Sequence, residues 1–212
     1  LNESNIETAT IELYDEDLYL LSINLKEYLG VVILGGPMNV YEEDKYPFLK
    51  WENNFIKEVL KEDIPLLGVC LGAQLIAKAA GGKISKAPQK EVGWFNVNLE
   101  KAASKDGLFK GVGDKIRVFQ WHEDTFTLPP QAVLLCRSNH LNQAFRIGQA
   151  HGLQFHIEVS PTIIKDWISR YCPQSKDQYL DMLTDFNHLK PQFEFQRNLI
   201  FQNFLSLILP NN

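Results

Sequence analysis

Apolar and polar residues along the first part of the chain form blocks that predict strands and helices in turn. Residues 8–13 alternate weakly and predict a short strand. The β-branched apolar run at 31–34 ends in Gly-Gly-Pro and predicts a strand buried on both faces, followed by a turn. Helical spacing of apolar residues then extends from Pro47 to Leu60. Strands and helices in this order predict a doubly wound, mainly parallel α/β sheet flanked by helices.

The stretch 64–77 carries the strongest local signal in the sequence. An apolar run breaks at Gly68, presents Cys70, and passes Gly72 into a helical pattern that ends near residue 80. This is the order of a nucleophile elbow, in which glycines flank a sharp turn because a Cβ there would clash with the strand or the helix. The helix N-terminus would favour the thiolate of Cys70. A free cysteine is more often a small buried hydrophobe, but the flanking glycines favour the elbow.

After residue 83 the pattern changes to short strand-like pieces separated by turn residues. No convincing helix lies between these pieces, so they predict a small antiparallel region beside the parallel core. The predicted strands are 94–99, 115–119, 132–136, 143–147 and 152–155.

The end of the chain is predicted to be helical. Pro161 opens one helix, and further helices are expected at 178–186 and 193–209. The sequence shows no internal repeat and no flexible linker. We therefore predict a single domain over 1–212, with an α/β core at 1–160 and a helical C-terminal extension at 161–212.

Composition excludes several classes of protein. The 212 residues are 45% hydrophobic and 22% charged, with a net charge of −5, so there is no basic footprint for nucleic acid or an anionic membrane. Three cysteines do not make a disulfide framework, no apolar run is long enough to span a membrane, and no signal peptide is visible. These features predict a cytoplasmic protein. The sequence has no glycine-rich phosphate loop, and we expect no cofactor.

A cysteine nucleophile needs a base, and the segment Gln-Phe-His-Ile-Glu offers one. In an extended segment His156 and Glu158 share a face, so the glutamate can orient the imidazole while its other nitrogen faces the sulfur. The alternative is a surface or satisfied core histidine. Backbone N–H groups of Leu71 and of the Gly35-Gly36-Pro37 turn are candidate donors to an oxyanion.

Five motifs together resemble a known family. They are Gly-Gly-Pro-Met-Asn-Val-Tyr (35–41), Gly-Val-Cys-Leu-Gly-Ala-Gln-Leu (68–75), Glu-Val-Gly-Trp (91–94), Gln-Trp-His-Glu-Asp-Thr-Phe (120–126) and Gly-Leu-Gln-Phe-His-Ile-Glu-Val (152–159). In this order they resemble the class I glutamine amidotransferases. Within that family the chain looks most like the free-standing branch similar to the glutaminase domain of GMP synthase.

The resemblance implies a flavodoxin-like class I amidotransferase fold and a Cys70–His156–Glu158 triad. Such a triad hydrolyses the side-chain amide of glutamine through a γ-glutamyl thioester and releases ammonia. Gly36 and Leu71 match the oxyanion positions. The matches to the substrate pocket and its lining loops are Gln74, Gly93, Trp94, Trp121 and His122. His122 and its acidic neighbours would otherwise suggest a metal site, but no second histidine or cysteine lies at ligand spacing, so no metal is predicted.

The sequence departs from the family pattern in two places. The family usually begins with a further strand and helix, which we expect to be missing here. Ile157 also stands where the family often has proline, and we expect the triad to survive this change because isoleucine also supports an extended backbone.

Two other functions stay open. A γ-glutamyl peptide hydrolase would use the same thioester with a different leaving amine. A regulatory subunit would keep the fold either without turnover or with turnover that depends on a partner. An intracellular-protease-like protein also places cysteine on an elbow, but the His-x-Glu segment favours the amidotransferases. A chain of this length has no room for a synthetase domain, so any ammonia acceptor is expected on a partner.

Overall fold

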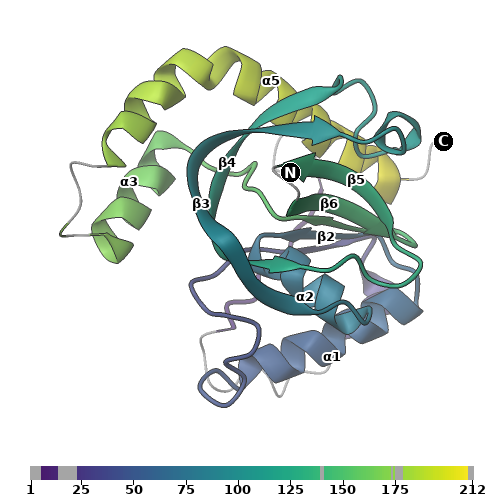
Figure 1. Ribbon diagram of the computed structural model, residues 1–212. Coiled ribbons are helices and arrows are strands. Elements are labelled where there is room, and N and C mark those ends of the chain that lie inside the picture. The colour runs from purple at the N-terminus through teal and green to yellow at the C-terminus, as the bar shows by residue number, and fades with distance from the viewer. Residues whose placement is uncertain (1–5, 14–22, 139–140, 173, 175–178, 210–212) are drawn as a thin grey trace.

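The computed structural model describes residues 6–13, 23–138, 141–172, 174 and 179–209. Seven strands in these residues form one sheet in the order β1-β2-β7-β6-β5-β3-β4 (Figure 1). The strands are β1 Val31–Ile33, β2 Leu66–Val69, β3 Ile84–Leu99, β4 Lys115–Phe126, β5 Val133–Ser138, β6 Leu141–Ile147 and β7 Ala150–Leu153. The helices are α1 Phe48–Lys61, α2 Leu71–Ala79, α3 Pro161–Tyr171 and α5 Asp181–Ile208, with short 3-10 helices η3 Leu25–Glu27 and η4 Ala103–Lys105. Among the described helices, none is long and apolar enough to cross a membrane.

The sheet has a parallel part and an antiparallel part. Strands β1, β2 and β7 pair in parallel, whereas β3, β4, β5 and β6 pair with their neighbours antiparallel. The predicted class is confirmed: an α/β fold with parallel strands, an antiparallel region and a C-terminal helical extension. Among the described strands the antiparallel part is larger than predicted.

The hairpin of β3 and β4 accounts for most of that difference. Strand β3 has 16 residues and β4 has 12, where only short strands at 94–99 and 115–119 were predicted. The first half of β3 is mostly exposed and includes the polar residues Lys86, Gln89 and Lys90. A strand without a core to cover shows no apolar alternation, so this half has no sequence signal. Figure 1 shows β3 as a long curved ribbon.

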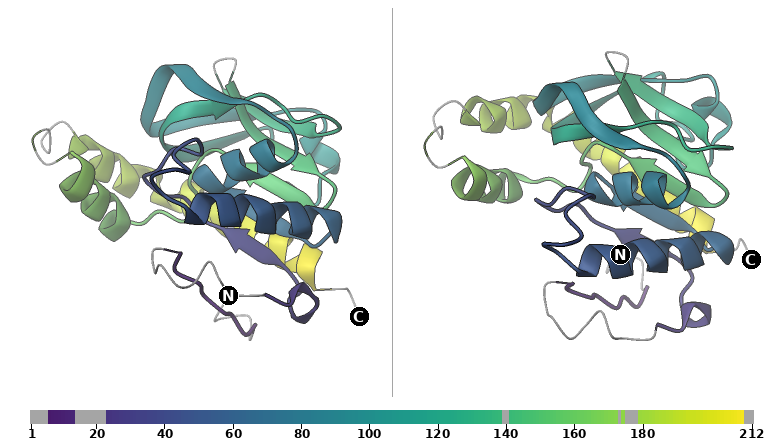
Figure 2. Two further views of the ribbon diagram at one scale, coloured as in Figure 1. Left: turned by 90° about the horizontal axis from the view of Figure 1, so that it is seen from below. Right: turned by 60° about the horizontal axis from the view of Figure 1, so that its bottom comes forward.

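Helices cover both faces of the parallel strands. Leu66 and Leu67 are adjacent in β2 and therefore point to opposite faces. Leu66 packs in the core beneath α1 and α2, whereas Leu67 packs with Ile200 and Phe204 of α5. Figure 2 shows α1 with α2 beside it and the yellow end of α5 beyond the strands. Each such fully buried side chain contributes about 1.5–3 kcal/mol.

The C-terminal extension contains one long helix where two were predicted. Helix α5 runs through Pro191, although a proline inside a helix removes a hydrogen bond and costs about 3 kcal/mol. Phe186 and Phe193, on either side of the proline, are both buried against Trp94 of β3. These tertiary contacts hold both halves in one helix, and Figure 1 shows the helix curving along its length.

Two predictions about the start of the chain were wrong. Residues 8–13 form no strand: the segment is largely exposed and pairs with none of the described strands. Strand β1 was expected to be buried on both faces, but Val32 is 41% exposed. Among the described strands β1 pairs only with β2, so it lies at an edge of the sheet and its outer side is uncovered.

The first turn of α2 lies unusually close to β1. A Cβ built on Gly72 would overlap the carbonyl oxygen of Ile33 and lie 2.9 Å from its carbonyl carbon. Backbone atoms cannot rotate away as a flexible side chain can. A glycine is therefore required at this crossing of helix and strand, as the elbow pattern predicted.

Replacing Gly72 with alanine should force the helix and β1 apart. We expect Gly72→Ala to lower the free energy of unfolding by about 3 kcal/mol, as overpacking of a rigid core does. Gly113→Ala is the control, because a Cβ there meets nothing within 4 Å and only its φ of +94° is unfavourable. Urea unfolding measures both variants, and equal losses would contradict a steric requirement at Gly72.

Candidate functional site

Cys70 occupies the turn between β2 and α2, as predicted. Its φ of 52° lies in the left-handed region, which costs a residue with a side chain about 1–3 kcal/mol. The Cys70 N–H donates to the Leu153 carbonyl of β7 at 2.8 Å. A Cβ on Gly68 would lie 2.7 Å from the backbone of Gly72, so the turn is tight on both sides of the cysteine. The sulfur is thus held at the carboxyl end of β2 and at the N-terminus of α2.

His156 and Glu158 are held together just beyond β7. The Nδ1 of His156 lies 2.6 Å from Glu158 Oε1, as the pairing of the two side chains predicted. The strand itself ends at Leu153, so the expected extended segment through residue 158 was wrong. Residues 154–158 bend, and the His156 N–H bonds the Phe119 carbonyl of β4 at 2.8 Å. The main chain at His156 is therefore held by a hydrogen bond to the distant strand β4, because β7 does not continue through this residue.

The glycine turn after β1 lies against both Cys70 and His156. A Cβ on Gly35 would lie 3.2 Å from Cε1 of His156 and 3.4 Å from Cβ of Cys70. These two side chains are therefore neighbours on the same side of the turn. Gly36 follows directly, and Leu71 is the first residue of α2, where an N–H has no partner inside the helix. Their role as oxyanion donors stays a prediction.

Electrostatics favour a protonated His156. Burial by itself lowers the pKa of His156, but the charges of Glu158 and then Cys70 outweigh it and raise that pKa to about 10. Burial raises the pKa of Glu158, but His156 and two backbone N–H groups lower it below its ordinary value of 4.5. At neutral pH the pair of buried His156 and partly exposed Glu158 therefore holds an imidazolium and a carboxylate.

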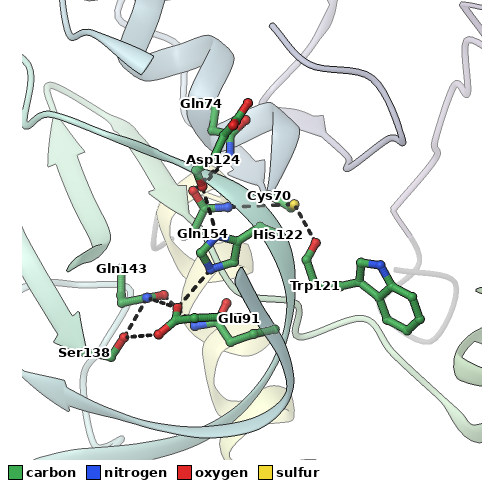
Figure 3. Close-up of polar contacts among 10 residues, drawn as sticks. Cys70, Gln74, Glu91, Trp121, His122, Asp124, Ser138, Gln143 and Gln154 are labelled. Carbon is green, nitrogen blue, oxygen red and sulfur yellow. Dashed lines mark hydrogen bonds and ion pairs between the residues drawn. The ribbon is translucent and has the colours of Figure 1, made fainter. Parts of the chain in front are cut away.

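Trp121 and Gln154 each form a hydrogen bond with the Cys70 sulfur (Figure 3). The Trp121 carbonyl oxygen lies 3.9 Å from Sγ, and the side-chain amide of Gln154 donates to Sγ at 3.8 Å. Trp121 was predicted to line the pocket, and it presents its carbonyl; Figure 3 shows its indole pointing away from the sulfur. Gln154 was not predicted, although it stands two residues before His156 inside the Gly-Leu-Gln-Phe-His motif.

Gln74 is linked to the Cys70 sulfur through the side chain of Gln154. Its Nε2 donates to Gln154 Oε1 at 3.1 Å and to the Asp124 carbonyl at 3.3 Å. Gln74 therefore belongs to the surroundings of Cys70, and its contact with a substrate stays a prediction.

His122 belongs to a buried polar network that extends from β4 to β3. Its Nε2 lies 3.0 Å from Glu91 Oε2, and its Nδ1 lies 2.9 Å from the Asp124 carbonyl. Burial raises the pKa of Glu91, but the hydrogen bond and the charge of His122 lower it below 4.5. Gln143 and Ser138 also donate to Glu91 (Figure 3). Both ring nitrogens are occupied within the protein, so the imidazole is engaged in packing the strands together.

The family resemblance implied that Gly93–Trp94 and Trp121–His122 lie in loops, but the first pair lies in β3 and the second in β4. Gly93 and Trp94 belong to β3, and they pair with Gln120 and Phe119 of β4. The Trp94 indole N–H donates to the Met182 carbonyl at 3.0 Å, which anchors α5. The assignment of these motifs to loops was wrong, because the hairpin is longer than its apolar pattern indicated. A role for Gly93 and Trp94 in substrate binding stays a prediction.

The helical extension also touches the site. Trp167 of α3 packs its ring against His156, with centroids 4.8 Å apart and planes at 67°. The same indole contacts Trp121, which stacks on Tyr179. The sequence predicted the helix that carries Trp167 but not this contact. Its contact with the imidazole depends on packing against distant residues, which include Phe119 of β4.

A cysteine on a strand-to-helix elbow, beside a histidine–glutamate pair and at the end of parallel strands, defines the class of site. A family model described as "Glutamine amidotransferase class-I" matches residues 1–170. The chain therefore belongs to the class I glutamine amidotransferase family.

Individual relatives agree with this family. A GMP synthase (glutamine-hydrolyzing) from Staphylococcus saprophyticus is 29% identical over 170 residues, which cover 76% of this chain and 31% of the relative. A GMP synthase (glutamine-hydrolyzing) subunit from Sulfolobus acidocaldarius is 36% identical over 143 residues, covering 65% of this chain and 71% of the relative. The structure of a glutamine amidotransferase from Thermotoga maritima is 40% identical, covers 88% of this chain and 82% of its own, and superposes with a TM-score of 0.78. The chain thus spans only about a third of the full-length GMP synthase that it matches.

Replacing Glu158 with glutamine tests the charge coupling in the His156–Glu158 pair. Glu158→Gln keeps the size of the side chain and removes its charge, so the pKa of His156 should fall from about 10 toward 6.5. NMR titration of the His156 imidazole measures the change, and exposed His188 on α5 gives a reference signal. A wild-type His156 that loses its proton near 6.5 would contradict the coupling.

The pKa shifts of His156 and Glu158 determine the pH range in which their interaction stabilises the fold. The pKa of His156 is raised on folding, so its contribution is complete below 6.5 and is lost as the pH rises through about 10. The pKa of Glu158 is lowered, so its contribution is present above 4.5 and is lost at lower pH. In urea unfolding, wild type and Glu158→Gln should differ most between pH 4.5 and pH 6.5 and converge toward about pH 10.

Proposed function

We propose that this chain hydrolyses the side-chain amide of glutamine through a γ-glutamyl thioester on Cys70. The observation that carries the proposal is the position of Cys70 on a strained elbow, with φ of 52°, beside the paired His156 and Glu158. Family membership supports the same reaction, and the matched GMP synthases carry glutamine hydrolysis in their names.

In the first step Cys70 Sγ attacks the amide carbon of glutamine. Because His156 already carries its proton, Cys70 attacks as a thiolate paired with the imidazolium, which the Glu158 carboxylate stabilises at 2.6 Å. The amide oxygen becomes an oxyanion, for which the backbone N–H groups of Leu71 and Gly36 are the proposed donors. A nucleophile held in a strained turn needs no rearrangement to reach the substrate.

In the second step the carbon–nitrogen bond breaks. His156 gives its proton to the leaving nitrogen, ammonia departs, and the γ-glutamyl group stays on the sulfur as a thioester. Neutral His156 then takes a proton from water, hydroxide attacks the thioester, and glutamate is released with regeneration of the thiolate. Glu158 orients the imidazole in both steps and does not touch the substrate.

The released ammonia is proposed to serve a separate synthetase. The chain covers 31% of a full-length GMP synthase but 71% of the GMP synthase subunit from Sulfolobus acidocaldarius. The name of that subunit supports the proposal that a synthetase partner accepts the ammonia. Glutamine is the proposed substrate, and neither nucleic acid nor a membrane is a proposed partner.

Removing the nucleophile tests the proposal. We expect Cys70→Ala to lower the release of ammonia and glutamate from glutamine by at least about a thousandfold, because no other group can form the thioester. Cys172→Ala is the matched control, since that thiol lies at the end of α3. A coupled glutamate dehydrogenase assay measures both variants.

Each other outcome of this assay has a definite meaning. Full activity of Cys70→Ala would contradict the triad. A γ-glutamyl dipeptide is measured in parallel, and Cys70-dependent turnover of the dipeptide alone would replace glutamine hydrolysis with γ-glutamyl peptide hydrolysis. No turnover of either compound would contradict a self-sufficient glutaminase.

A further inference from the structure

Besides His156, the described residues give the Cys70 sulfur two hydrogen-bonding partners, and these two have opposite preferences. A carbonyl oxygen, here that of Trp121, can only accept, so it favours a sulfur that still carries its proton. The Gln154 side-chain amide faces the sulfur with its NH2 group, which can only donate, so it favours the anion. We propose that Gln154 is a second donor to the nucleophile, which stabilises the Cys70 thiolate and sets the pH range in which the sulfur reacts. This deepens the proposed function, because it takes Cys70 as the nucleophile.

A chain of hydrogen bonds fixes the orientation of the Gln154 amide. The Asp124 carbonyl can only accept, so the Gln74 group that faces it at 3.3 Å must be Nε2. That same Nε2 lies 3.1 Å from the Gln154 amide, which must therefore present Oε1 to it. The remaining group of Gln154, its Nε2, then faces Cys70 Sγ at 3.8 Å. A flipped Gln154 would set two donors against each other and turn an oxygen toward the sulfur.

The Asp124 carbonyl that begins this chain is itself held in place. His122 Nδ1 lies 2.9 Å from the same oxygen, and the other ring nitrogen of His122 is bound to Glu91. Two strands, β3 and β4, thus determine which atom of Gln154 faces the sulfur. Figure 3 shows these contacts as one connected set from Glu91 to Cys70.

Burial strengthens the hydrogen bond from the Gln154 amide to the Cys70 sulfur. Gln154 is 0% exposed and Gln74 is 4% exposed, so water does not compete for the amide hydrogens. The Gln154 N–H also donates to the Gln143 carbonyl of β6 at 2.8 Å, which fixes the main chain. Hydrogen bonds to charged groups are stronger than those between neutral groups, and a low local dielectric strengthens them further.

The donor acts at a defined stage of the proposed reaction. Before attack the sulfur is a thiolate beside the His156 imidazolium, and it accepts from Gln154. Once the thioester forms, the sulfur is neutral and no longer needs this donor. Gln154 therefore stabilises the reactive thiolate before attack and does not take part in the proton transfer itself.

Alkylation of Cys70 tests this role independently of turnover. The probe is iodoacetamide, applied from about pH 5 to about pH 9, and peptide mass spectrometry follows the modification of Cys70 alone. In Gln154→Met the pH profile should shift to higher pH by about one unit, so the rate at the acidic end should fall roughly tenfold. In Gln154→Glu the shift should lie in the same direction, because a carboxylate oxygen would then face the thiolate. Gln154→Glu keeps the side-chain size and decides the matter if Gln154→Met does not fold.

Two controls separate this role from a general loss of packing. Gln196→Met removes another buried glutamine, whose amide bonds the Lys115 carbonyl and the Arg117 N–H, and its Cys70 profile should match that of the wild type. The profile of Cys172 in each variant should also stay unchanged. An unshifted Cys70 profile in Gln154→Glu would overturn the proposal, even if glutamine turnover were lost. A shifted profile without glutaminase activity in the wild type would instead refute the proposed function and leave the donor role standing.

Discussion

The site depends on the tight crossing of the first turn of α2 against the neighbouring strands. Cys70 can take a left-handed backbone conformation only because the surrounding chain holds it there, through the Leu153 carbonyl on one side and the approach of Gly72 to Ile33 on the other. The cost of about 1–3 kcal/mol for that conformation is offset by the buried core on both faces of β2. The sulfur position follows from this packing, and the other groups of the site are arranged around it.

Charge and hydrogen bonding then organise the space next to the sulfur. On one side a buried imidazolium, which Glu158 stabilises at 2.6 Å, supplies positive charge. On the other side an oriented amide, that of Gln154, supplies hydrogens without charge. Trp167 of the C-terminal extension packs on the imidazole, so the helices after the α/β core contribute to the same site. The extension therefore contacts the candidate site as well as the core of the fold.

The features that could be predicted from the sequence are those with a local cause. The elbow around Cys70 needs glycines two residues on each side, and His156 and Glu158 are only two residues apart, so both patterns are visible in short stretches. Features with long-range causes could not be predicted. The bend after Leu153 depends on the Phe119 carbonyl, and the orientation of Gln154 depends on strand contacts far away in the sequence.

The errors in the predicted elements have the same origin. The polar half of β3 covers no core and therefore lacks an apolar alternation, whereas α5 continues through Pro191 because aromatic contacts on both sides hold it. The family resemblance placed Gly93 and Trp94 in a loop, whereas the residue pattern began a short strand at Trp94, and neither showed the full length of the hairpin. Local propensity predicted these elements less well than it predicted the elbow, since packing against distant residues determines them.

The most direct measurement of the central claim is detection of the covalent intermediate. The wild-type protein is mixed with glutamine, quenched in acid within the first turnover, and digested for peptide mass spectrometry. If Cys70 is the nucleophile, the peptide that contains it gains the mass of one γ-glutamyl group, and Cys70→Ala gains none. Release of ammonia without this adduct on Cys70, or with an adduct on another residue, would contradict the thioester mechanism.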